Sequence, residues 1–68
     1  MERFDIGQKI REARIGKGMT QADLAEALDV SQGAVGQWEQ GITVPKFRNL
    51  VALSELFGIP VGDLLKVG

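Results

Sequence analysis

The sequence predicts an all-α fold, a compact domain of five short helices that spans residues 1–68. Apolar residues recur at intervals of three or four along the chain, and no segment alternates apolar and polar residues as a half-buried strand does. Gly, Pro, Ser and Thr residues divide the chain into segments of helical length. Because cysteine is absent, no disulfide stabilises this small domain and its apolar core must suffice.

The first two helices are predicted over residues 5–17 and 21–28. Gly18 follows the first helix at the position where a left-handed residue commonly ends one. Thr20 is predicted to cap the second helix, and Asp23 stands three residues later, which is close to a capping box.

The third helix is predicted over residues 32–40, after a very short connection. Ser31 is its predicted N-cap, and Gly41 is predicted to end it. Asp29 is predicted to lie in the connection with a left-handed backbone, which Asp tolerates better than most residues.

A fourth helix is predicted over residues 47–57, after Pro45 and before Gly58, and Pro60 is predicted to open a short fifth helix. The periodicity of these segments places one apolar side of each helix toward a common core. The side chains predicted to face this core are Ile6, Ile10, Ala13, Leu24, Ala25, Leu28, Val35, Trp38, Leu50, Leu53, Leu56, Phe57, Val61, Leu64 and Leu65.

Charge is distributed unevenly along the chain, although its net value is only −1. Residues 21–44 contain no Lys or Arg, whereas basic residues occur before and after them. A net charge near zero argues weakly against a nucleic-acid partner. The chain contains neither a signal-peptide pattern nor an apolar run of about 20 residues, so we expect a cytoplasmic protein with no membrane partner.

Few residues suited to catalysis are present, since the chain has no His, Cys or Tyr. Ser31 is explained as a helix cap, and no general base follows it in a recognisable pattern. Asp23, Glu26 and Asp29 stand at helical spacing without a calcium loop, which favours a solvated acidic face over a metal site. We therefore expect no enzymatic activity, no metal and no cofactor.

One side of the predicted third helix carries only glutamine and glycine. We call this surface the Gln/Gly face; it consists of Gln32, Gly33, Gly36, Gln37 and Gln40. A surface helix usually carries charged residues, and glycine costs about 1 kcal/mol relative to alanine inside a helix. The face is either a tolerated neutral surface or a binding surface. Glutamine suits the second role because it can pair bidentately with adenine, and glycine permits close backbone approach.

The stretch TQADLAEALDVSQGAVGQWEQG resembles the helix-turn-helix of the phage-repressor class, the Cro/CI or XRE family, whose fold is lambda-repressor-like. It follows IGQKIREARIGKGM and precedes a Pro-bearing loop and NLVALSELFGIPVGDLL, so the resemblance covers about residues 6–65. Asp29 replaces the glycine that is usual in the turn. The third helix and the loop after Gly41 also lack the basic residues that are frequent there.

The resemblance implies specific roles for residues of this chain. Gln32, Gly33, Gly36 and Gln37 are expected at base edges in the major groove. Phosphate contacts are expected from Gln21, Arg11, Arg14, Lys17, Gln40, Lys46, Arg48 and the backbone near Phe47. The resemblance further implies a structural ion pair between Arg14 and Glu39. Trp38 is expected in the core against the fourth helix, not on a base.

The resemblance therefore implies a sequence-specific regulator of transcription that binds double-stranded DNA, most simply a phage-type repressor. A single domain would bind weakly, so we expect a homodimer on an operator with two half-sites about 34 Å apart. About three phosphate contacts per subunit would give a salt slope near −5. The alternative is an antitoxin-like or protein-interaction module that uses the same fold with weak or no DNA binding.

Overall fold

The computed structural model of the protein describes residues 6–65. Within this range the chain forms five helices, α1 (Ile6–Gly16), α2 (Gln21–Leu28), α3 (Gln32–Gln40), α4 (Phe47–Phe57) and α5 (Val61–Leu64). The predicted all-α fold is thus confirmed, and the bounds of α2, α3 and α4 coincide with those predicted. The first helix ends at Gly16 and not at Lys17, and its predicted first residue, Asp5, lies outside the described residues.

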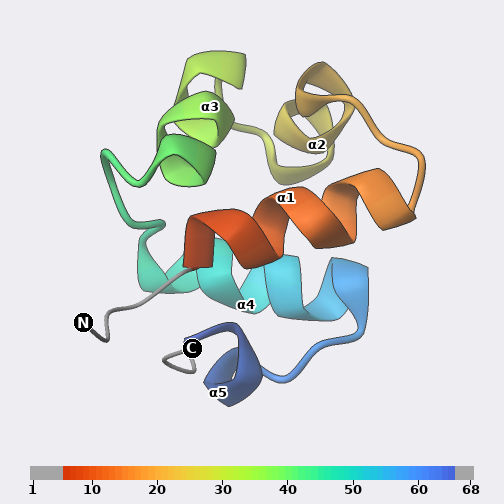
Figure 1. Cartoon of the computed structure of the whole chain (residues 1–68), viewed down its shortest axis with the longest axis vertical. Coiled ribbons are helices and arrows are strands. Elements are labelled where there is room, and N and C mark those ends of the chain that lie inside the picture. Colours follow the sequence, from red (N-terminus) through yellow and green to blue (C-terminus); the bar gives the residue numbers. More distant parts are fainter. Residues whose placement is uncertain (1–5, 66–68) are drawn as a thin grey trace.

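Helix α1 runs through the middle of the fold (Figure 1). Helices α2 and α3 pack together on one side of it, whereas α4 and α5 pack on the other side. This arrangement leaves one side of the α2–α3 pair facing outward, away from the rest of the chain. In the part of the chain that the structure describes, each helix is too short or too polar to cross a membrane.

The geometry of the α2–α3 pair is fixed by caps at both helix starts and by the turn between them. The Thr20 hydroxyl accepts the Asp23 N–H, and the Asp23 carboxylate accepts the Thr20 N–H, each at 3.0 Å, which confirms the predicted capping box. Asp29 has φ 58°, the left-handed conformation predicted for the turn. The Ser31 hydroxyl caps α3 by accepting the Ala34 N–H at 3.1 Å. These local bonds determine the direction in which α3 leaves the turn.

The core joins side chains from all five helices. The largest fully buried side chains are Ile10, Leu24, Val35, Leu53 and Leu64. Other residues predicted to face inward, including Leu28, Leu56, Phe57, Val61 and Leu65, are only partly buried against this core.

Trp38 is buried, as predicted, with 4% of its surface exposed. It belongs to the same core cluster as Leu50 and Leu53 of α4, while the backbone of its helix lies mainly beside α1 and α2. The close approach of α1 depends on Gly7, where a Cβ atom would collide with the backbone carbonyl oxygens of Trp38 and Glu39. The end of α3 is therefore held by backbone contact with the start of α1.

Candidate nucleic-acid interface

The Gln/Gly face lies on the outward side of α3. Gln32, Gly33, Gln37 and Gln40 are exposed and Gly36 is partly so, whereas Val35 and Trp38 on the opposite side are buried. Helix α3 carries no cation. The face is consequently an uncharged surface whose glutamines can form hydrogen bonds. The opposite side of the helix is buried in the core.

The two glycines of this face are not required by the fold. Neither has a positive φ, the conformation that would favour glycine. A Cβ atom at Gly33 would lie 3.8 Å from the Ser31 Oγ, and one at Gly36 would lie 3.8 Å from the Gln21 Oε1. Both are ordinary van der Waals contacts, so alanine would fit and would favour the helix by up to about 1 kcal/mol. Packing within the fold therefore does not explain glycine at these positions.

An ion pair between Arg14 and Glu39 supports α3 from behind. The Arg14 guanidinium donates from Nε to Glu39 Oε2 at 2.7 Å and from Nη2 to Glu39 Oε1 at 3.2 Å, a bidentate geometry. Its Nη1 donates to the Met19 carbonyl oxygen at 2.8 Å. The side chains are 12% and 4% exposed, respectively. The resemblance implied this pair, and the structure contains it.

Gln21 extends this network from the start of α2. Its Nε2 donates to the Glu39 Oε1 at 3.1 Å, so one carboxylate oxygen accepts from both Gln21 and Arg14. No pattern in the sequence signals this bond, because the two residues are 18 positions apart on different helices. The bond depends on how α1, α2 and α3 pack together.

The network sets the protonation of its members. Burial opposes ionisation of Glu39, but hydrogen bonds from Arg14 and Gln21 and the positive charges of Arg14 and Arg11 outweigh it, so the pKa of Glu39 is lowered. The hydrogen bond to Glu39 raises the pKa of Arg14. Both groups are therefore charged at neutral pH, and the pair carries no net charge toward the outside.

The predicted phosphate-binding residues fall into two groups. Arg14 and Gln21 belong to the network, and Arg14 already uses three of its N–H groups inside the protein. The others are exposed at α1, at the end of α3 and at the start of α4: Arg11, Lys17, Gln40, Lys46, Phe47 and Arg48. No side chain caps α4, whose N-cap is Lys46; the Asn49 N–H donates to the Lys46 carbonyl oxygen at 2.8 Å, which leaves the N–H groups of Phe47 and Arg48 available to an anion.

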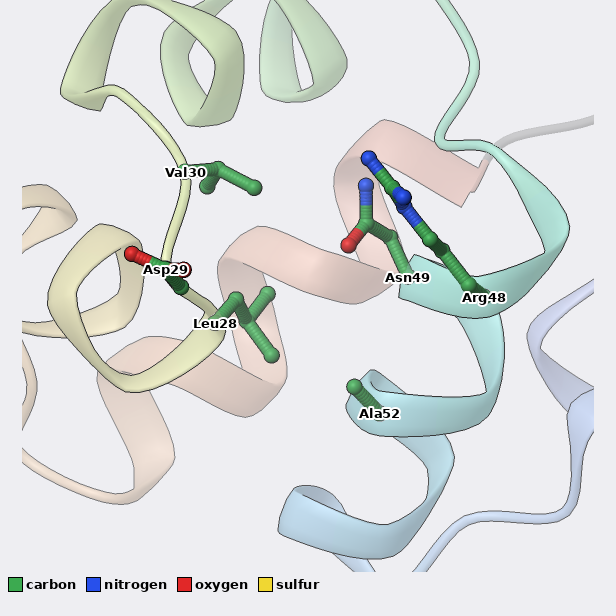
Figure 2. A pocket seen from close by; sticks show the side chains of 6 residues that line it. All are labelled: Leu28, Asp29, Val30, Arg48, Asn49 and Ala52. Atoms are coloured by element: carbon green, nitrogen blue, oxygen red, sulfur yellow. The ribbon is translucent and has the colours of Figure 1, made fainter.

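Two further surface features were not predicted. The loop before α4 exposes Ile42 and Val44, and Phe47 beside them is 71% exposed. A shallow cleft separates the α2–α3 turn from the start of α4 (Figure 2); it is lined by Leu28, Asp29, Val30, Arg48, Asn49 and Ala52. The first feature had a partial signal in the sequence, since ITV occupies a loop where basic residues are frequent in the family that the chain resembles. Among the described residues, no group of three or more possible metal ligands occurs.

The chain belongs to the helix-turn-helix family of the phage-repressor, XRE type. The profile of the family described as "Helix-turn-helix" matches residues 10–64. This family consists of transcription regulators and is not a class of enzymes.

Relatives are similar to this chain over most of its length. It is 38% identical over 61 residues to the repressor protein C2 of Salmonella phage P22, 45% over 51 residues to the transcriptional regulator DicA of Escherichia coli (strain K12), and 36% over 62 residues to the transcriptional activator BcrR of Enterococcus faecalis. The matches cover 90%, 75% and 91% of this chain, but only 28%, 38% and 30% of those proteins.

Solved structures agree with the fold. The P22 c2 repressor in complex with a synthetic operator superposes with a TM-score of 0.85 at 38% identity, covering 90% of this chain and 92% of that one. The biofilm regulator SinR in complex with DNA gives a TM-score of 0.81 at 29% identity, covering 90% and 98%.

Proposed function

We propose that this protein is a sequence-specific, double-stranded-DNA-binding regulator of transcription, a repressor of phage type that acts in the cytoplasm. The observation that carries the proposal is the Gln/Gly face, whose glycines the fold does not require and whose glutamines are exposed on a rigidly held helix. In the major groove, Gln32 and Gln37 would hydrogen-bond base edges, while Gly33 and Gly36 allow α3 to approach closely. Two of its structural neighbours are regulators solved with an operator or with DNA.

Phosphate binding is assigned to the exposed basic residues and to the uncapped start of α4. Arg11, Lys17, Lys46 and Arg48 supply the charge, and the backbone N–H of Phe47 adds a donor. Gln40 adds an uncharged donor at the end of α3. Arg14 contributes less, since its side chain is 12% exposed and is held by Glu39 and Met19.

Two copies are proposed to bind together. One copy offers the groove a single short helix and a few exposed cations, so two copies on half-sites with centres roughly 34 Å apart would supply the affinity that one copy lacks. With about three phosphates neutralised per copy, the salt slope is expected near −5.

A protein-interaction module remains the second candidate. Helix α2 exposes Asp23 and Glu26 toward solvent, and the loop before α4 exposes Ile42 and Val44. Acidic and apolar surfaces suit a protein partner better than they suit DNA.

Selection from a random-sequence duplex pool, followed by mobility-shift titration, distinguishes the two candidates. A DNA-binding regulator should enrich an inverted repeat and shift random duplex weakly at low salt, and added salt should abolish the weak shift. If no shift occurs at low salt even at high protein concentration, the protein-interaction module becomes the better description.

A further inference from the structure

The orientation of the Gln21 side-chain amide is fixed by the chemistry of its partner. The Glu39 carboxylate can only accept hydrogen bonds, so the amide nitrogen of Gln21 must face it, at 3.1 Å. The carbonyl oxygen of Gln21 must then point away from Glu39. This conclusion does not depend on how the oxygen and nitrogen of the amide are assigned.

The carbonyl oxygen of Gln21 lies at the edge of the Gln/Gly face. It is the nearest atom to the position that a Cβ of Gly36 would take, at 3.8 Å. Because Gly36 has no side chain, the space beside it is open, and the amide of Gln21 borders that space. A residue of α2 thereby adds a hydrogen-bond acceptor to a surface otherwise formed by α3.

We propose that Glu39 is a positioning residue, which turns the carbonyl oxygen of Gln21 outward so that it accepts a hydrogen bond from the exocyclic amino group of adenine or cytosine. This inference rests on the proposed function, because it assumes that the Gln/Gly face enters the major groove. In that groove adenine N6 and cytosine N4 are donors, whereas guanine and thymine present only acceptors. Gln21 would then discriminate between bases at one step of each half-site.

Glu39 can hold this position without repelling DNA because Arg14 neutralises it. The carboxylate is bound by Arg14 through two hydrogen bonds and is 4% exposed, so little of its charge faces the phosphates. Gln21 lies over it as a neutral group. The remaining N–H of Gln21 stays available for a phosphate, but such a contact would carry no base preference.

The substitution Glu39→Gln tests the orientation directly. The new amide keeps its oxygen on the shorter bond, from Arg14 Nε at 2.7 Å, so its nitrogen takes the place of Oε1, gives up the longer bond from Arg14 Nη2 and faces Gln21. Gln21 must then rotate to accept, and its own NH₂ group turns outward. We expect the preference at one step of each half-site to change from adenine or cytosine to guanine or thymine, by about tenfold in relative affinity.

The experiment compares sites selected from a random-sequence duplex pool by the parent, Glu39→Gln, Gln21→Ala and the double variant. Gln21→Ala should lose discrimination at that one step, and Glu39→Gln should add no further change in its background. Gln37→Ala is the matched control, since it removes a glutamine of the same face that does not contact Glu39; it should alter a different step and leave the effect of Glu39→Gln intact.

Each outcome decides the matter. An unchanged preference in Glu39→Gln, or a uniform loss of affinity in Gln21→Ala with the same selected site, would overturn the inference and leave the proposed function standing. If the parent enriches no site, both fail together. If Glu39→Gln does not fold, Gln21→Ala alone decides, because a contact to phosphate cannot produce a loss of discrimination confined to one step.

Discussion

Helix α3 and the start of α4 offer two different kinds of polar surface. Helix α3 is capped by Ser31, held from behind by Glu39 and uncharged outside, whereas α4 begins without a side-chain cap and displays Lys46 and Arg48. Hydrogen bonds to bases depend on direction and need rigid support, while attraction between charges extends over a Debye length of about 10 Å and tolerates motion. The fold thus supports α3, the proposed reading helix, by hydrogen bonds and carries its positive charge elsewhere.

The largest expected effect concerns the support behind α3. Glu39→Ala removes the acceptor of both Arg14 and Gln21 and leaves the guanidinium, which is 12% exposed, with only the Met19 carbonyl. The free energy of unfolding should fall by about 3 kcal/mol. Arg14→Ala should cost a similar amount, and urea denaturation measures both.

Lys46→Ala is the control for this prediction, because Lys46 is exposed and makes no side-chain cap. Its effect should stay within about 0.5 kcal/mol. Denaturation midpoints of Glu39→Ala and Arg14→Ala equal to that of the parent would contradict a structural role for the pair.

Acid should weaken the ion pair between Arg14 and Glu39. The pKa of Glu39 is lower in the folded protein than the ordinary value of 4.5, despite the opposing effect of burial, because of its bonds to Arg14 and Gln21 and the charges of Arg14 and Arg11. Its stabilising contribution is therefore complete above the ordinary glutamate pKa and is lost as the pH falls through the lowered one. The hydrogen bonds of Asp23 with Thr20 lower the pKa of Asp23 and act in the same direction.

Urea denaturation at a series of pH values from neutrality down to acid checks this. The free energy of unfolding of the parent should begin to fall near the ordinary glutamate pKa and continue to fall below it. Glu39→Gln should show a smaller fall over the same range, with the contribution of Asp23 retained. Identical pH profiles for the two proteins would show that Glu39 does not stabilise the fold through its charge.

Replacing a glutamine of α3 should reduce the preference for the selected site, whereas replacing Lys46 before α4 should reduce affinity for all sequences and the salt dependence of binding. Gln32→Ala and Gln37→Ala each remove one base contact, which should cost about 1–3 kcal/mol on the selected site and little on random duplex. Their salt slopes should remain near that of the parent, because neither side chain neutralises a phosphate. Titrations on both duplexes at several salt concentrations measure affinity and slope together.

Lys46→Ala is the matched comparison, because it removes a proposed phosphate contact and leaves the proposed base contacts in place. It should weaken binding to all sequences alike and reduce the salt slope by about 0.9 per subunit. If both glutamine variants retain the full preference of the parent for the selected site, α3 is not the element that reads the sequence.

The helices and their caps could be predicted from the sequence because each depends on residues a few positions apart. The capping box of Thr20 and Asp23 and the left-handed turn at Asp29 are local in this sense, and the predicted bounds of α2, α3 and α4 were right. The burial of Trp38 was also predicted, because periodicity shows which side of a helix faces the core, although it does not show which helix covers that side.

The site was predictable to the extent that it lies on one helix. The spacing within 32–40 was enough to find the Gln/Gly face. By contrast, the bond between Gln21 and Glu39 and the cleft beside Arg48 depend on how α1, α2, α3 and α4 meet. Local spacing contains no information about either, and only the resemblance anticipated the Arg14–Glu39 pair.

The smallest expected effect concerns Gly36, and it has opposite signs for the fold and for binding. A methyl group there meets the Gln21 carbonyl oxygen at 3.8 Å, an ordinary contact, so Gly36→Ala should stabilise α3 by up to about 1 kcal/mol. The same methyl group occupies the space beside Gln21 through which the DNA would approach, so affinity for the selected site should fall. Gly62→Ala is the matched control, since its Cβ would meet nothing within 4 Å and α5 is outside the proposed interface; it should leave DNA affinity unchanged. A Gly36→Ala protein that is more stable and binds as tightly as the parent would show that α3 does not come close to the DNA at this position.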